Sequence, residues 1–220
     1  FQAVAGLVGT VLTIWGRASS INVQKVMFAV GELGLPHARI DAGGAFGKLD
    51  TPEFAARNPN RRVPVIDDNG FVLWESSAIV RYLADTYGRG SLAPEGRQSF
   101  ARADQWADWA IIYVYPDVRT CFLGLTMRAK AERDEKAIAD AAARLGDTLA
   151  ILDRQLAGNT FILGDRLTFA DVIAGAYMYR YVSVDIPRPA LPNVTRWYRA
   201  LTERPAYRRH VMIGDMATKA

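Results

Sequence analysis

Two hydroxyl side chains and one amide lie close together near the start of the chain, at Ser19, Ser20 and Asn22. An apolar run at 12–15 precedes them and predicts a short strand, while apolar residues at 23, 26, 27, 30 and 33 follow with the period of a helix. The unpaired N–H groups and the positive dipole end of a helix start can bind an anion. Hydroxyls are also common helix caps, so this segment alone leaves capping and chemistry equally open.

The composition of the chain argues against several other kinds of chemistry. Its 220 residues carry 27 basic and 23 acidic side chains without a concentrated basic block, so nucleic-acid or membrane-surface binding has little support. Cys121 is the only cysteine, which rules out an intrachain disulfide, and its apolar neighbours are typical of a buried thiol. His37 and His210 are far apart and match no metal-ligand spacing, so we expect no metal site.

The first eleven residues do not fit the patterned part of the chain. Phe1-Gln2 resembles what a protease leaves after a tag is removed, and the apolar segment 3–11 has no basic residues before it. We therefore interpret 1–11 as a tag remnant or a flexible N-terminus. No apolar run approaches the ~20 residues that a membrane helix needs, so we expect a cytoplasmic, soluble protein.

The remaining pattern divides at a linker, residues 88–96, which holds three glycines and one proline. Strand and helix patterns alternate before it, with strands at 12–15 and 37–40, a hairpin around Asn69-Gly70 and a helix after Glu75. Helical periods fill the chain after it, most clearly at 135–156. We expect an α/β domain at 12–88 and an all-α domain at 97–212.

Pro64 is out of place in the first hairpin strand, predicted at 63–66, because proline has no N–H to give to a ladder. Either this strand lies at an edge of the sheet, or the Val63–Pro64 bond is cis and turns the N–H and C=O of Val63 outward. The pattern alone leaves both explanations open.

Four segments together resemble the cytosolic glutathione transferase family. They are Arg17-Ala-Ser-Ser-Ile-Asn22, Asn58-Pro-Asn-Arg-Arg-Val-Pro64, Glu75-Ser-Ser-Ala-Ile79 and Thr168-Phe-Ala-Asp171, in this order. The likeness covers 12–212 and implies a thioredoxin-like N-terminal domain followed by an all-helical C-terminal domain. The first turn has no tyrosine or cysteine, so the chain looks like the bacterial serine-type groups, which are theta- and nu-like.

The resemblance implies a site for glutathione in the first domain. Pro64 matches the family's cis proline, and the backbone of Val63 before it would pair with the cysteinyl part. Glu75 and Ser76 match the acid and hydroxyl that hold the γ-glutamyl end. Ser77 stands where some relatives have an arginine, so one carboxylate contact is expected to be missing.

Three further roles follow from the same resemblance. Ser20 with Asn22 fits best the pair that contacts the glutathione sulfur, and Ser19 is the alternative if the alignment slips by one. Arg61 or Arg62 could pair with the glycyl carboxylate.

The implied activity is addition of the glutathione thiolate to a hydrophobic electrophile, by a homodimer in detoxification, with no cofactor besides the co-substrate. Lowering a thiol pKa from ~8.5 to ~7 gives ~16-fold more thiolate at pH 7, of which a weaker nucleophile cancels ~5-fold. Activation alone is therefore worth only ~3-fold, and positioning of the electrophile must supply the rest.

The electrophile pocket is assigned to the first helix of the second domain. Tyr113 and Arg119 are the better candidates there, while Trp106 and Trp109 fit core packing more readily, with Trp109 kept as a third candidate. Two other functions remain open. One is glutathione-dependent reduction of a disulfide or peroxide without a protein thiol, and the other is a non-catalytic glutathione-binding or interaction module.

Overall fold

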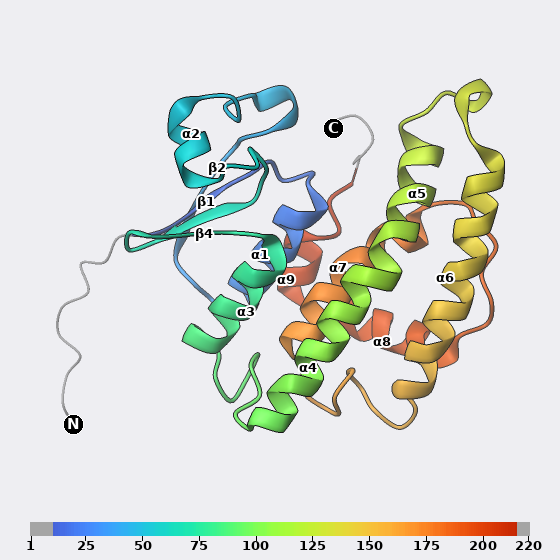
Figure 1. The fold of residues 1–220 in the computed structure, drawn as a ribbon. Coiled ribbons are helices and arrows are strands. Elements are labelled where there is room, and N and C mark those ends of the chain that lie inside the picture. The colour runs from blue at the N-terminus through green and yellow to red at the C-terminus, as the bar shows by residue number, and fades with distance from the viewer. Residues whose placement is uncertain (1–10, 215–220) are drawn as a thin grey trace.

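A mixed sheet organises the N-terminal part of the chain in the computed structural model, which describes residues 11–214 (Figure 1). β1 (Leu12–Trp15) pairs in parallel with β2 (His37–Ile40) and antiparallel with β3 (Val65–Asp68). β3 pairs antiparallel with β4 (Phe71–Trp74), so the strand order is β2-β1-β3-β4. The predicted strands at 12–15, 37–40 and 71–74 are confirmed. Of the predicted tag or flexible segment 1–11, residues 1–10 lie outside the described residues.

The hairpin strand with the misplaced proline begins two residues later than predicted. β3 begins at Val65 and lies between β1 and β4, so it is not an edge strand. The Val63–Pro64 bond is cis. Pro64 therefore precedes the ladder and interrupts none of its hydrogen bonds.

Helix α1 (Ile21–Glu32) is buried on nearly all sides. It connects β1 to β2 and packs against α3 (Ser76–Tyr87) as well as against two helices of the C-terminal part. Every residue from Val23 to Val30 is buried, including Gln24 and Lys25. The sequence pattern predicted one buried face, and the additional contacts explain why the polar residues of α1 are enclosed too. A short helix α2 (Pro52–Arg57) and a 3₁₀ turn η1 (Gly44–Phe46) lie in the connection between β2 and β3.

The C-terminal part is helical, as predicted. Its elements are α4 (Arg97–Trp109), η2 (Ala110–Val114), α5 (Tyr115–Thr126), η3 (Lys130–Glu132), α6 (Glu135–Gln155), α7 (Phe169–Ser183), α8 (Pro192–Thr202) and α9 (Pro205–His210). The period predicted for 135–156 is confirmed, because Ile138, Leu145, Leu149 and Leu152 of α6 are all buried. Helix α7 packs against α1 and α3 of the α/β part and against α4 and α5 of the helical part.

The start of α7 is fixed by a carboxylate with several donors. Asp171 accepts hydrogen bonds from the backbone N–H groups of Ile162 and Thr168 and from Nε1–H of Trp197, each at 2.9 Å. Thr168 and Asp171 form a capping box, the arrangement that a hydroxyl followed three residues later by an acid favours. Because α7 carries a residue of the cavity described below, this buried junction contributes to positioning it.

Helices α4 and α5 are continuous through a π-helical segment, η2. A π turn holds one more residue than an α turn, so it shifts which side chains face a given direction. Pro116 follows within the first turn of α5, where its missing N–H is tolerated. The π segment therefore lies before the proline, and its effect on the pocket is described below.

Candidate functional site

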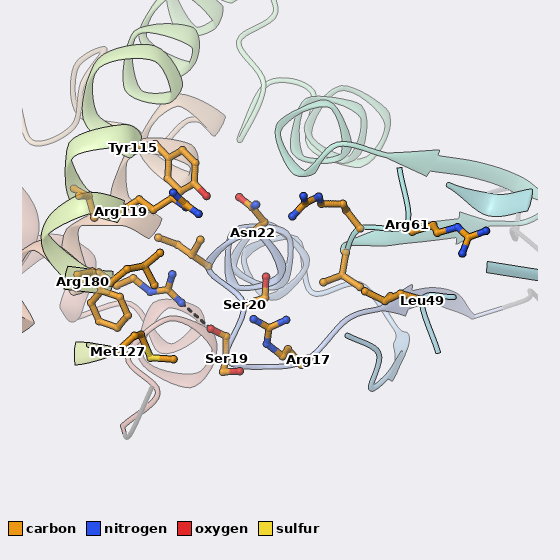
Figure 2. A pocket seen from close by; sticks show the side chains of 16 residues that line it. Arg17, Ser19, Ser20, Asn22, Leu49, Arg61, Tyr115, Arg119, Met127 and Arg180 are labelled. Carbon is orange, nitrogen blue, oxygen red and sulfur yellow. Dashed lines mark hydrogen bonds between the residues drawn. The ribbon is translucent and has the colours of Figure 1, made fainter. Parts of the chain in front are cut away.

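A cavity of about 300 Å³ lies where the start of α1 meets α5 and α7 (Figure 2). The α/β part contributes Arg17, Ser19, Ser20, Ile21, Asn22, Leu49, Arg61, Arg62 and Val63. The helical part contributes Tyr115, Val118, Arg119, Phe122, Leu123, Met127 and Arg180. In the view of Figure 2, Ser20 lies between these walls, with Arg119, Arg180 and Met127 on one side and Arg61 and Leu49 on the other.

Ser20 occupies the N-cap position of α1 without using its side chain as a cap. Its backbone N–H donates to the carbonyl of Arg17 at 3.1 Å, and its carbonyl accepts from the N–H of Gln24 at 2.8 Å. The hydroxyl makes no hydrogen bond to any residue in 11–214, and no acidic side chain lies in the first turn. The capping alternative is therefore wrong for this side chain, which is left facing the cavity.

Asn22 belongs to a hydrogen-bonded chain that joins α1 to the start of α3. The hydroxyl of Ser76 donates to Oδ1 of Asn22 at 3.3 Å. Nζ of Lys25 lies 3.0 Å from the hydroxyl oxygens of both Ser76 and Ser77, and it donates to both. This chain brings Ser76 beside the first turn, although Ser76 itself is buried and does not line the cavity.

Lys25 is an enclosed cation that the sequence analysis did not identify. Besides its two hydroxyl partners, its Nζ lies 5.0 Å from the centre of the Tyr177 ring on α7. Burial lowers the pKa of Lys25 from 10.5 to about 7; the charge of Arg81 adds to this shift and that of Glu75 opposes it. Lys25 thus contacts Ser77, the position at which the sequence predicted that an arginine contact is missing.

Of the residues predicted to hold the γ-glutamyl and cysteinyl parts, Val63 lines the cavity, whereas Pro64, Glu75 and Ser76 do not. Glu75 is the N-cap of α3 with φ of 71°, an uncommon backbone conformation for a non-glycine residue. Its carboxylate is exposed and forms no ion pair within 11–214. Val63 lines the cavity, and neither its N–H nor its C=O is hydrogen-bonded to another described residue. Both positions therefore offer groups to a ligand.

The two predicted glycyl-binding arginines lie at the exposed rim. Arg61 and Arg62 both line the cavity. Arg61 lies 3.4 Å from Asp50, whose side chain is almost fully exposed, so this pairing is weak. The backbone carbonyl of Arg62 accepts from Nδ2 of Asn58 at 2.9 Å, which fixes the loop and leaves both guanidinium groups at the opening.

The helical wall differs from the predicted electrophile pocket. Arg119 lines the cavity, but Tyr113 and Trp109 do not. Tyr113 lies in η2 and is 57% exposed, while Trp109 packs edge-on against Trp106 at 5.0 Å. The π turn explains the difference, because it rotates the following residues and brings Tyr115 to the cavity instead.

The wall also contains residues that the sequence analysis missed. Phe122 and Met127 give it an apolar surface, and Arg180 enters from α7. The carbonyl of Ser19 accepts from Nη2 of Arg180 at 2.7 Å, which ties the first turn to the helical part (Figure 2). No group of His, Cys, Asp and Glu side chains suited to a metal ion occurs in residues 11–214. None of the helices in that range is long and apolar enough to cross a membrane.

Comparisons with known proteins agree with this geometry. The family model "Glutathione S-transferase, N-terminal domain" matches residues 10–85, and "Glutathione S-transferase, C-terminal domain" matches residues 115–205. The chain is 40% identical to glutathione S-transferase GstB of Escherichia coli K12 over 92% of its own length and 98% of that protein. It is 28% identical to glutathione S-transferase D6 of Drosophila melanogaster, over 86% of each chain.

A solved structure extends the likeness to the arrangement in space. The theta class glutathione S-transferase of Xanthomonas axonopodis pv. citri, determined with glutathione bound, is 40% identical with a TM-score of 0.88. The match covers 94% of this chain and 99% of that one. A thioredoxin-like α/β part, a helical part and a cavity between them define the class of protein. The chain belongs to the glutathione S-transferase family.

Proposed function

We propose that this protein binds glutathione in the cavity and transfers its thiolate to an electrophile held against the helical wall. The observation that carries the proposal is the hydroxyl of Ser20, which faces the cavity at the start of α1 without a partner in the described chain. A thiolate placed there would accept a hydrogen bond from Ser20 and lie at the positive end of the α1 dipole. Asn22 is the second contact, and Ser19 remains the alternative to Ser20.

The rest of glutathione has complementary groups on the α/β side. Val63 offers its backbone N–H and C=O to the cysteinyl part. Glu75 can accept from the α-ammonium, while Ser76 and the N-terminus of α3 receive the α-carboxylate. Arg61 or Arg62 would pair with the glycyl carboxylate, although their exposure weakens that contribution.

The chemistry is nucleophilic attack by sulfur, with the protein supplying orientation. The hydroxyl of Ser20 and the helix dipole favour the thiolate and together reach the roughly 2 kcal/mol that a shift of ~1.5 pKa units requires. The net gain from activation is small, as calculated above, so holding the electrophile beside the sulfur dominates. Tyr115, Phe122 and Met127 form the wall against which it would rest.

Two alternatives are distinguished by the same site. Cys121 is buried and its pKa is raised by burial, so the protein thiol is not placed for redox chemistry. Reduction of a disulfide or peroxide would therefore have to use glutathione alone. A non-catalytic glutathione-binding module would retain the cavity without turnover.

We also propose a homodimer in the cytoplasm with a role in detoxification. Support for the dimer is limited to exposed apolar side chains on β4, Phe71 and Val72, and on η2, Ile112 and Tyr113. Such side chains are typical of contact surfaces when they gather in a patch. Sedimentation equilibrium would show a dimer mass, and a monomer at all concentrations would contradict this part of the proposal.

The test is retention on immobilised glutathione followed by assays with 1-chloro-2,4-dinitrobenzene, a small disulfide and a hydroperoxide. We expect retention and conjugation. Retention without turnover would leave the binding module, and reduction without conjugation would favour the second enzyme function. If the protein shows no retention and no activity, the proposal is contradicted.

A variant pair tests the γ-glutamyl assignment. Glu75→Gln removes the charge that would pair with the α-ammonium, and glutathione affinity should fall about 10-fold or more, as expected for a lost charge-assisted hydrogen bond. Glu53→Gln is the matched control, because Glu53 is also an exposed glutamate but lies in the first turn of α2 and not at the start of α3. Titration calorimetry measures both; equal affinities would remove Glu75 from the site.

A further inference from the structure

Arg180 is a mostly buried cation in the cavity, and most of its hydrogen-bonding capacity is unused within residues 11–214. It comes from α7, most of which is apolar and buried, and its guanidinium lies 4.8 Å from the centre of the Phe122 ring. Its one hydrogen bond within residues 11–214 goes from Nη2 to the carbonyl of Ser19 at 2.7 Å. Nε is buried and has no hydrogen-bond partner in the part of the chain that the structure describes. Burial lowers the pKa of Arg180 to about 10, and the nearby charge of Arg17 adds to the shift while Tyr115 opposes it.

Among residues 11–214, the side chains that line the cavity around Arg180 carry positive charge and include no carboxylate. None of the residues that line the cavity is an aspartate or glutamate. Arg119 faces the same space from α5 and forms no ion pair with any described residue. Nε of Arg17 is likewise buried without a partner. A desolvated guanidinium normally lies beside an anion or a complete set of acceptors, so this wall is built for a ligand that brings negative charge.

Glutathione does not supply that charge under the function proposed above. Its two carboxylates are assigned to the start of α3 and to Arg61 or Arg62, which belong to the α/β part. Arg119 and Arg180 belong to the helical part and lie on the opposite side of Ser20 in Figure 2. The side chain of Arg17 lies against Gly44 in the α/β part. A Cβ built on that glycine would be only 3.2 Å from Cδ of Arg17. The guanidinium groups of α5 and α7 therefore face the second substrate.

We propose that the electrophile is itself an anion, whose carboxylate pairs with Arg180 and Arg119 while its reactive carbon lies beside the sulfur at Ser20. A planar guanidinium with free N–H groups suits a carboxylate because two parallel hydrogen bonds can form. The ring of Phe122 and the side chain of Met127 would contact the apolar body of the same molecule. This proposal rests on the transferase function and adds the class of second substrate, an apolar electrophile with one carboxylate.

The reaction leaves the carboxylate unchanged. For an aryl chloride, the glutathione thiolate forms a C–S bond to the ring carbon, and chloride leaves with the electron pair of the C–Cl bond. The thiol proton is released to solvent when the thiolate forms. Arg180 acts as a binding group that orients the ring and takes no proton.

The experiment compares two electrophiles that differ in charge, 4-chloro-3-nitrobenzoate and 4-chloro-3-nitrobenzamide. Each kcat/KM is divided by the uncatalysed rate constant with glutathione, which removes the difference in intrinsic reactivity. We expect the native protein to favour the benzoate and Arg180→Met to lower this preference 10- to 100-fold, equivalent to ~1.4–2.7 kcal/mol. Arg180→Lys should retain part of it, and Arg97→Met, which removes an exposed arginine outside the cavity, should leave it unchanged.

Glutathione affinity separates this proposal from its alternatives. Titration calorimetry should give a dissociation constant for glutathione that Arg180→Met changes less than ~2-fold. If Arg180→Met weakens glutathione binding and lowers both rates alike, Arg180 serves glutathione and the proposal is overturned. An unchanged preference in the variant overturns it too.

A binding measurement covers the case in which neither electrophile is turned over. The glutathione conjugates of the benzoate and of the benzamide can be titrated directly into the native protein and the Arg180→Lys variant. Tighter binding of the benzoate conjugate by the native protein alone supports the anionic subsite, whatever the activity. Equal binding of both conjugates contradicts it, while failure to bind glutathione in any form contradicts the transferase function itself.

Discussion

Lys25 of the α/β part is fully buried and does not line the cavity, whereas Arg180 of the helical part lines the cavity and is mostly withdrawn from solvent. Lys25 has two hydroxyl acceptors at 3.0 Å and an aromatic ring at 5.0 Å. Arg180 has one carbonyl acceptor, an aromatic ring and a buried Nε without a partner. The α/β part and the helical part thus surround a cationic side chain with different sets of partners.

The difference separates a supporting group from a binding group. The partners of Lys25 are the side chains that hold the first turn and the start of α3 together, so its charge serves the protein's own structure. The hydrogen-bond partners of Arg180 within residues 11–214 are incomplete, and the side chain lines the cavity. A buried cation with complete partners stabilises a fixed arrangement, whereas one with unused donors beside a cavity is expected to pair with a ligand.

Replacing Lys25 tests the first half of this comparison and should have the largest effect. Its folded-state pKa of about 7 lies below the ordinary value of 10.5, so the unfolded chain binds more protons between these values. The free energy of unfolding of the native protein should therefore rise with pH across this window and be lost as the pH falls towards 7. From pH 7 to 9 the gain is at most about 2–3 kcal/mol, near 1.4 kcal/mol per proton and pH unit.

The Lys25→Met variant should lack this rise, because methionine keeps the packing and removes the titrating group. Urea denaturation at pH 7, 8 and 9 measures it, and Lys130→Met, at an exposed position in η3, is the control that should follow the native protein. Parallel pH dependences for the native protein and Lys25→Met would show that Lys25 stays protonated in the folded protein across this window, and would contradict the lowered pKa.

Ser20→Ala tests the point where the two walls meet. Loss of the hydroxyl should raise the thiol pKa of bound glutathione by about 1 unit, with little change in glutathione affinity. Turnover at pH 7 should fall about 2-fold through the net loss of activation and up to ~10-fold in all, because the sulfur is also positioned less well. Above pH 9 the activation loss should disappear, since the thiol is then ionised in both proteins and is more nucleophilic in the variant. Thiolate absorbance and kcat against pH measure both effects.

Ser19→Ala is the matched variant, because Ser19 contacts Arg180 through its backbone carbonyl, which the substitution retains. If Ser19→Ala shifts the thiol pKa and Ser20→Ala does not, the assignment is one residue out of register. If neither shifts it, the sulfur does not bind at this turn.

Much of the α/β wall was predictable because local patterns specify it. Glycine, proline and strand alternation located the sheet, and the approach to Pro64 raised the cis alternative that the structure contains. The capping box at Thr168 and Asp171 depends on residues three apart, so it too was visible in the sequence. The sequence identified Ser20 as a candidate, but it could not show that its hydroxyl does not cap α1, because that depends on the orientation of one side chain.

The helical wall was less predictable because tertiary packing determines it. An α-helical period assigned Tyr113 to the pocket, whereas the π turn at Ala110–Val114 brings Tyr115 there. Apolar residues occur on all sides of α7, so no periodic pattern indicated that the Arg180 side chain points into the cavity. Lys25 lies between the apolar positions of α1, so the helical period did not indicate its burial, which follows from the packing of α3 and α7 against α1.

Arg119→Gln probes how the positive charge of the helical wall is divided, and it should have the smallest effect. Arg119 is exposed while Arg180 is mostly buried, and an exposed ion pair contributes well under 1 kcal/mol because solvent and salt screen it. The preference for the benzoate over the benzamide should fall only about 2- to 3-fold, and this difference should vanish in 0.5 M salt. The larger effect of Arg180→Met should persist at that salt concentration, because a desolvated pair is screened much less. Equal losses in the two variants at both salt concentrations would mean that the wall binds its anion as a single exposed cluster, and the contrast between enclosed and exposed charge would have to be abandoned.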